Sequence, residues 1–194
     1  MASGSAIPIA ISARHAHLSP ASIERLFGAN YSLTPRGDLS QTGQFAAIER
    51  VTLIGPKGRL EGVRLIGPPR EQDQIEISRS DEFTLGIDAP IRLSGDLTNS
   101  GGVIVEGPRG RMELANGVIV ALRHIHMSPA DAAAFGVKDR DKVAVRIDSR
   151  ERDVIYEDVI VRVEPSFRLE LHLDTDEANA AGVEAGTTAQ LLRT

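Results

Sequence analysis

The sequence predicts a mainly β fold, of the barrel or sandwich type, with only a few short helices. Short runs rich in Val, Ile and Leu recur along the chain, and Gly, Pro or Asp separates them. Only a few short segments carry helix signals. Many short strands with few helices favour barrels or sandwiches over a parallel, doubly wound sheet.

The predicted strands are spread over the whole chain. In order they are IPIAIS (7–12), RVTLIG (50–55), LEGVRLIG (60–67), QIEIS (74–78), IRLSG (91–95), GVIVAL (117–122), KVAVRID (142–148), DVIVRV (158–163) and RLELHLD (168–174). Aromatic residues make up only 4% and Trp is absent, so we expect a core of Val, Ile, Leu and Ala.

Three short helices are predicted, over 20–27, 129–135 and 174–183. The first two follow Ser19 and Ser128, each an expected N-cap with Pro at the first helical position. Gly28 and Gly136 are placed to end them. The third begins at Asp174 with Glu three residues later, which is the spacing of a capping box.

Composition excludes several classes of protein. The absence of Cys removes disulfides, thiolate metal ligands and a covalent cysteine mechanism, and it fits a reducing cytoplasm. A net charge of −5 argues against general nucleic-acid binding. No apolar run approaches the roughly 18 residues of a membrane-spanning helix, and the opening MASGSAIPIA lacks the features of a secretory signal. We therefore expect a cytoplasmic protein with no nucleic-acid or membrane partner.

A short internal repeat holds four of the five histidines. The pattern Arg-His-x-His-x-Ser-Pro-Ala begins at Arg14 and again at Arg123, an offset of 109 positions that is far too long for a solenoid. Each copy lies at a predicted junction between a strand and a helix. The repeat therefore indicates two related half-sites.

The histidine pairs indicate metal binding. Residues i and i+2 of a strand project from one face, so His15 and His17 can point together, as can His124 and His126. The alternative is that they are polar residues at strand ends. A catalytic zinc site usually has three protein ligands, so each pair lacks one.

Two residues are candidates for the missing ligands. His172 alternates with Leu171 and Leu173, and Glu76 alternates with Ile75 and Ile77. Taken singly, each is more typical of a solvated or satisfied polar position. The spacing does not decide which pair either residue would complete.

Residues 57–70 hold Lys57, Arg59, Arg64 and Arg70 against one acid, Glu61. On an acidic protein this cluster can bind phosphate, and Arg70 can grip a phosphate with two hydrogen bonds. An exposed hairpin with alternating charges is the alternative interpretation. Phosphate-loop, nucleophile-elbow and His-Glu-x-x-His motifs are all absent, which favours metal and positioned substrates over a covalent enzyme intermediate.

Four segments in order resemble the PduL-type phosphate propanoyltransferases, or phosphotransacylases. They are SARHAHLSP (12–20), RLIGPPREQDQIEISRSD (64–81), LRHIHMSPADA (122–132) and PSFRLELHLDTDEANAAGV (165–183), and the resemblance covers nearly the whole chain. It implies two small β-barrels capped by short α-helices. One is a discontinuous domain of residues 1–13 plus 122–194 and the other spans 14–121, with the active site in the cleft between them and the histidine pairs at the crossovers.

The resemblance also implies a dinuclear zinc site, although another divalent transition metal is possible. His15, His17 and Glu76 resemble the ligands of one ion, and His124, His126 and His172 those of the other. Arg70 matches the phosphate-binding arginine. Ser12, Arg64 and Asn179 fall near positions that contact coenzyme A.

The implied activity is reversible acyl transfer: a propanoyl- or acetyl-CoA plus phosphate gives an acyl phosphate plus coenzyme A. A homo-oligomer is a further expectation. Family members in bacterial microcompartments often carry an amphipathic segment before the first barrel, and only 14 residues precede His15, so microcompartment targeting is not expected. The alternatives are a metal-dependent hydrolase, in which the same ligands activate water, and a non-enzymatic metal-binding module.

Overall fold

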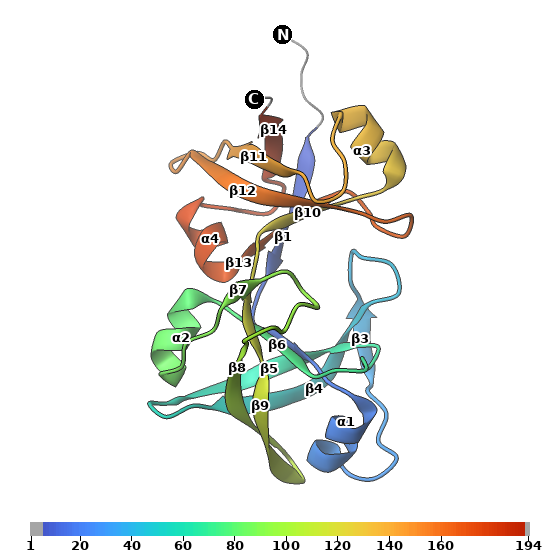
Figure 1. Cartoon of the computed structure of the whole chain (residues 1–194), viewed down its shortest axis with the longest axis vertical. Helices are drawn as coiled ribbons and strands as arrows, with labels where there is room; N and C mark the ends of the chain where they lie inside the picture. The colour runs from blue at the N-terminus through green and yellow to red at the C-terminus, as the bar shows by residue number, and fades with distance from the viewer. Residues whose placement is uncertain (1–5, 193–194) are drawn as a thin grey trace. The chain divides into compact units, whose positions relative to one another are not determined.

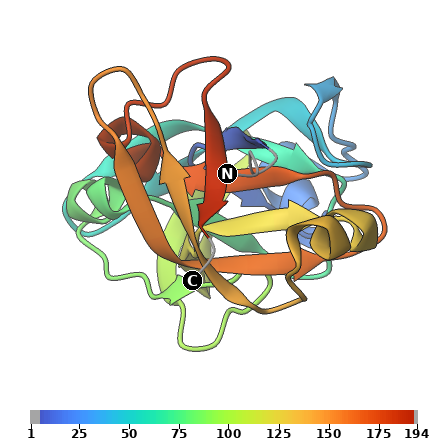
Figure 2. The same cartoon turned by 90° about the horizontal axis from the view of Figure 1, so that it is seen from above.

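The computed structural model describes residues 6–192 (Figures 1 and 2). The chain divides into two compact units. One unit combines the segment that ends at Ser12 with the segment that begins at Leu122, and the other runs from Ala13 to Ala121. We call them the discontinuous unit and the continuous unit.

The discontinuous unit is a closed barrel, and its yellow-to-red strands curve around an axis in Figure 2. Around the barrel, the strands are β1 (Ile7–Ser12), β13 (Glu170–Asp174), β10 (His124–Met127), β12 (Val154–Val163), β11 (Lys142–Ile147) and β14 (Thr188–Leu192), which pairs with β1 again. Its helices are α3 (Pro129–Phe135) and α4 (Thr175–Ala180).

The continuous unit also contains a closed ring of six strands. The ring runs through β4 (Phe45–Ile54), β5 (Arg59–Gly67), β2 (His15–His17), β6 (Gln74–Ile77), β9 (Gly110–Ala121) and β8 (Gly101–Gly107), which pairs with β4. Strand β3 (Pro35–Asp38) adds to β4, and β7 (Ile91–Arg92) adds to β9. The helices of this unit are α1 (Pro20–Phe27) and α2 (Arg79–Leu85).

The predicted mainly β fold with two helix-capped barrels is therefore confirmed. Several element predictions were incomplete. Strands β3, β8 and β14 and helix α2 were not predicted, and the strand expected over 91–95 is only β7, followed by a turn at Ser94. Helix α2 carries a signal that could have revealed it: Ser78 and Asp81 form a capping box, and Gly86 ends the helix in the left-handed conformation.

Each unit has its own apolar core. The core of the continuous unit is built mostly from Val, Ile, Leu and Ala, with Phe27 as its one buried aromatic residue among those described. The core of the discontinuous unit has the same aliphatic character and includes Met127. This agrees with the composition, which offers few aromatic side chains to fill a barrel.

The histidine repeats stand where the chain passes from one unit to the other. Strand β1 ends in the discontinuous unit at Ser12, and β2 begins in the continuous unit at His15. The return passage follows Ala121, and β10 begins at His124. The helix that follows each pair starts as predicted, with Ser19 or Ser128 as N-cap and Pro in the first turn.

Candidate functional site

The first group of candidate ligands is assembled by strands β2 and β6. The two strands are antiparallel, with His15 opposite Glu76. Ala16 between the histidines is fully buried in the core, so both rings project from the other face of β2. Nε2 of His15 lies 3.6 Å from Oε2 of Glu76. Ligand atoms of His15, His17 and Glu76 all lie within 4.8 Å of one another, so the three can hold one cation.

Strands β10 and β13 assemble the second group in the discontinuous unit. His124 stands opposite His172 in an antiparallel pairing, and their rings stack with centroids 4.9 Å apart. Ile125 is buried in the core, which again sends its two histidine neighbours to the opposite face. His124, His126 and His172 offer ligand atoms within 4.8 Å of one another. The spacing of residues in the sequence does not decide which candidate lies beside which histidine pair. The strand pairing places Glu76 beside the first pair and His172 beside the second.

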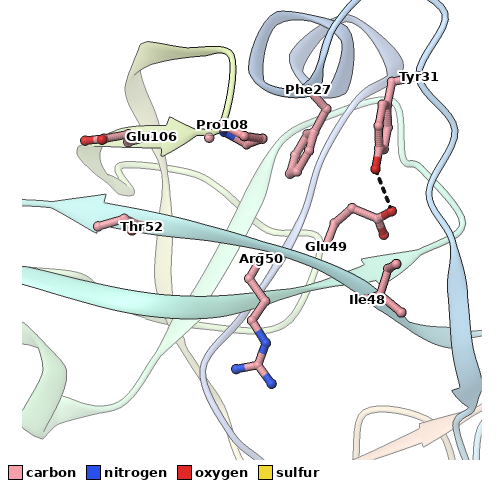
Figure 3. A pocket seen from close by; sticks show the side chains of 9 residues that line it. Phe27, Tyr31, Ile48, Glu49, Arg50, Thr52, Glu106 and Pro108 are labelled. Atoms are coloured by element: carbon pink, nitrogen blue, oxygen red, sulfur yellow. Dashed lines mark hydrogen bonds between the residues drawn. The ribbon is translucent and has the colours of Figure 1, made fainter.

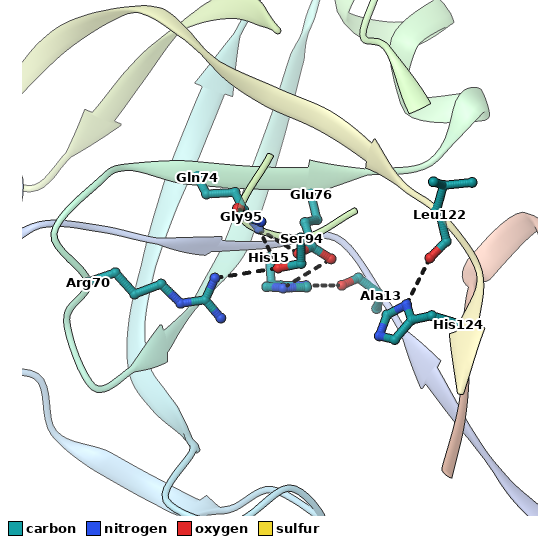
Figure 4. Close-up of polar contacts among 9 residues, drawn as sticks. All are labelled: Ala13, His15, Arg70, Gln74, Glu76, Ser94, Gly95, Leu122 and His124. Carbon is teal, nitrogen blue, oxygen red and sulfur yellow. Dashed lines mark hydrogen bonds and ion pairs between the residues drawn. The ribbon is translucent and has the colours of Figure 1, made fainter. Parts of the chain in front are cut away.

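The first histidine of each pair is oriented by the backbone just before it. Nδ1 of His15 lies 2.9 Å from the carbonyl oxygen of Ala13, and Nδ1 of His124 lies 2.8 Å from that of Leu122 (Figure 4). A carbonyl oxygen only accepts, so Nδ1 of each ring donates to it and Nε2 lies on the opposite side of the ring. Backbone support of this kind is typical of metal-binding histidines.

The second histidine of each pair is held neutral. Burial lowers the pKa of His17 to about 3, and the charges of His15 and Arg70 act in the same direction. Burial lowers the pKa of His126 to about 2, and its histidine neighbours add to the shift. Neutral imidazole is the form that binds a metal.

The buried ring nitrogens fit a cation. Among the described residues, Nδ1 of His17, both ring nitrogens of His126 and Nε2 of His172 are buried without a hydrogen-bond partner. A buried polar atom without a partner costs free energy that a coordinated metal would recover. Two His and one Glu, or three His, are ligand sets that catalytic zinc takes.

Arg70 lies beside the group in the continuous unit. Its Nη1 lies 3.5 Å from Oγ of Ser94, and its charge reaches His17. Gln74 donates to the same Ser94 oxygen over 2.8 Å and to Oε1 of Glu76 over 2.6 Å. Figure 4 shows Arg70, Ser94, Gln74 and Glu76 as one polar cluster. A guanidinium beside candidate ligands can hold a phosphate next to them. Ser94 was not identified from the sequence, where it lay in an expected strand.

Three of the four cations of residues 57–70, Arg59, Arg64 and Arg70, have different polar partners. Arg59 pairs with Glu61 at 3.2 Å on the exposed part of the hairpin, as the alternative interpretation expected. Arg64 is half-buried and donates to the carbonyl of Ala47. Burial lowers the pKa of Arg64, and the charges of Arg50 and Arg36 lower it further. Three guanidinium groups on neighbouring strands thus concentrate positive charge on a chain whose net charge is −5.

Comparison with known proteins bears on what these groups do. A family model described as phosphate propanoyltransferase matches residues 8–184. The phosphate propanoyltransferase of Thermotoga maritima is 51% identical over 180 residues, covering 93% of this chain and 86% of that protein. The chain belongs to the phosphate propanoyltransferase family.

Two further relatives agree. The phosphate propanoyltransferase of Klebsiella pneumoniae is 53% identical over 179 residues, which cover 92% of this chain and 85% of the relative. That of Lachnoclostridium phytofermentans is 48% identical over 190 residues, covering 97% and 88%. The family membership predicted from the four segments is confirmed. As a member of the phosphate propanoyltransferase family, the chain is an acyltransferase.

Ser12 and Asn179 lie near the two ends of α4 in this family member. Ser12 is in register with Asp174, the N-cap of α4, and it is half-buried. Asn179 is exposed near the end of the helix. Both side chains belong to the discontinuous unit, whereas Arg64 belongs to the continuous one.

No helix in the described part of the chain is both long and apolar enough to span a membrane.

A separate cavity of about 510 Å³ lies between the end of α1 and strands β4 and β8 (Figure 3). In it, the hydroxyl of Tyr31 donates to Glu49 over 3.0 Å, and the backbone of Thr34 donates to the same carboxylate. Arg50 points away from the aromatic pair of Phe27 and Tyr31. None of the candidate ligands lines this cavity, and the buried carboxylate of Glu49 is already hydrogen-bonded.

Proposed function

We propose that the chain transfers a short acyl group reversibly between coenzyme A and inorganic phosphate. An acyl-CoA such as propanoyl-CoA or acetyl-CoA plus phosphate gives the acyl phosphate plus coenzyme A. The observation that carries the proposal is the position of Arg70, a phosphate-binding type of side chain, beside the buried group of His15, His17 and Glu76. The relatives, which are phosphate propanoyltransferases, support the same reaction class.

We assign one zinc ion to each group, and another divalent transition metal would fit the same ligands. His15, His17 and Glu76 would hold one ion, and His124, His126 and His172 the other. When bound, zinc supplies a Lewis acid for the thioester carbonyl and affinity for a thiolate sulfur. Three ligands each leave a coordination position for substrate.

Arg70 would bind and orient the phosphate. Two parallel N–H donors of its guanidinium match two phosphate oxygens and offset their charge. A phosphate oxygen attacks the acyl carbon, a C–O bond forms, and the C–S bond breaks with its electron pair on sulfur. Holding the two reactants in attack geometry removes about 7 to 11 kcal/mol of barrier in favourable cases. Ser94, which Arg70 and Gln74 both approach, would fix the direction of the guanidinium.

Coenzyme A carries several phosphate groups, and the arginines around Arg64 suit them. Arg50 stands opposite Arg64 in the β4–β5 pairing, and the charge of Arg36 also reaches it. Grouped guanidinium groups repel one another, and an anionic ligand relieves that repulsion. Ser12 and Asn179 stay predicted contacts of the same ligand.

The test is release of coenzyme A from acetyl-CoA or propanoyl-CoA by the purified protein, with and without phosphate. Release that requires phosphate is the expected result. Release without phosphate would identify a thioester hydrolase, and no release with bound metal would identify a metal-binding module. Light scattering on the same preparation measures whether the chain forms the homo-oligomer expected from the sequence.

A further inference from the structure

The two units pair their strands in the same register around the metal groups. In the continuous unit, His15 stands opposite Glu76 and His17 opposite Gln74. In the discontinuous unit, His124 stands opposite His172 and His126 opposite Glu170. Gln74 and Glu170 therefore occupy equivalent positions. Each lies two residues before the third side chain of its group, on the same face of its strand.

The equivalence extends beyond these strands. Strands β6 and β13 each lead into a helix that begins with a capping box, whose N3 residue is Asp81 or Glu177. Arg14 pairs with Asp81 at 3.0 Å, and Arg123 pairs with Glu177 at 2.9 Å. The first arginine of each histidine repeat thus forms an ion pair with the N3 residue of the helix that follows β6 or β13. The local architecture around each group is one arrangement used twice.

Gln74 acts directly on Glu76. Only 2% of Gln74 is exposed, and its amide nitrogen donates to Oε1 of Glu76 over 2.6 Å. Two more hydrogen bonds hold the same amide: its nitrogen donates to Oγ of Ser94, and its oxygen accepts from the backbone nitrogen of Gly95 over 2.8 Å. A side chain held at three points restricts the carboxylate that it contacts, and the second carboxylate oxygen is directed toward His15.

Glu170 acts on His172 through its charge. Oε2 of Glu170 lies 3.1 Å from Nε2 of His172, and the contact is an ion pair and not a hydrogen bond. Only 9% of Glu170 is exposed, so water screens its charge weakly. The group of three histidines contains no carboxylate of its own. Glu170 gives it the negative charge that Glu76 gives the other group.

We propose that Gln74 and Glu170 are positioning residues, each acting on its metal through the third side chain of the group. Gln74 holds the carboxylate of Glu76, and Glu170 supplies the charge that draws a cation toward His172. The proposal rests on the metal binding in the proposed function. It states that these two residues raise the affinity of each group for its metal.

The test measures zinc affinity one group at a time, by competition with a chromophoric chelator. Gln74→Leu is studied with His124→Ala, so that the continuous unit supplies the measured site. Glu170→Gln is studied with His15→Ala, so that the discontinuous unit supplies it. Each change is expected to weaken zinc binding by about 10- to 100-fold relative to its own background. Glu170→Asp, which keeps the charge, should restore most of the loss.

Matched controls use exposed residues of the same units. Gln72→Leu, on the loop before β6, is the control for Gln74→Leu. Glu184→Gln, after α4, is the control for Glu170→Gln. Both should leave zinc affinity within twofold. With cobalt in place of zinc, the visible absorption of the Gln74→Leu site should shift, because the direction of its carboxylate ligand changes.

The outcomes separate this inference from the proposed function. Unchanged affinities and cobalt spectra in a protein that performs phosphate-dependent transfer would overturn the inference and leave the function standing. Lowered affinities in a protein without transferase activity would support the inference and remove the function. A wild-type chain that binds no divalent metal, or equal losses in the controls, would overturn the inference.

Discussion

Replacement of Arg70 by Lys separates the geometry of phosphate binding from its charge. Arg70 is half-buried and lies 3.5 Å from Oγ of Ser94, and its charge acts on His17. Lys keeps the positive charge but cannot make two parallel bonds to phosphate. A hydrogen bond to a charged group contributes about 1.5 to 3 kcal/mol. Loss of one such bond predicts a fall in kcat/KM for phosphate of about 10- to 150-fold, since each 1.36 kcal/mol is tenfold.

The assay varies phosphate at saturating acyl-CoA and follows release of the free thiol. The KM for acyl-CoA and the zinc content should stay near wild type, and Arg70→Ala should lose more activity than Arg70→Lys because it also removes the charge. The reasoning would be refuted if Arg70→Lys lost zinc, or if its defect appeared in the KM for acyl-CoA and not in the use of phosphate.

Three further outcomes are expected. His124→Ala should lower the zinc bound per chain, measured by elemental analysis, together with activity, and an unchanged metal count would reject that ligand. Arg64→Ala should raise the KM for acyl-CoA, and equal KM values in wild type and variant would contradict a contact between Arg64 and coenzyme A. Comparison with a dephospho-CoA thioester shows whether that contact is to the terminal phosphate. Ile125→Ala, in the fully buried strand position between two candidate ligands, should cost about 2 to 5 kcal/mol of unfolding free energy, whereas Ile155→Ala, 49% exposed, should cost much less in the same denaturant titration.

The histidine pairs could be placed from the sequence because strand alternation is a local property. His15 and His17 flank Ala16, which is fully buried, so their common face follows from the period of the strand. The third partner of each pair could not be found in the same way. Strand pairing between distant segments sets it: alternation offered Glu76 and His172 as candidates, and only the resemblance to the family assigned each to a pair, with which the structure groups it.

The parts that the sequence did not reveal have physical reasons. Helix α2 was missed because Ser78 continues the alternation of the strand before it, although the same residue caps the helix. Strand β8 was missed although GGVIVEG (101–107) is a Val/Ile-rich run that forms a tight hairpin with β9; only its pairing with β4, which closes the ring, depends on a distant segment. The contacts of Gln74 could not be found from the sequence, since its hydrogen bonds to Ser94 and Gly95 depend on a loop 20 residues away.

The interrupted path of the chain has a consequence for the order of folding. The continuous unit is made of residues 13–121, and the strands at its two ends, β2 and β9, flank β6, with His15 opposite Glu76 and Val120 opposite Ile77. Two strands on either side of a third are about 10 Å apart. Closing a loop of about 110 residues costs about 4 kcal/mol of chain entropy, and prior folding of the continuous unit removes most of that cost. The barrel that borrows β1 should therefore gain protection from hydrogen exchange second, after the middle of the chain is already formed.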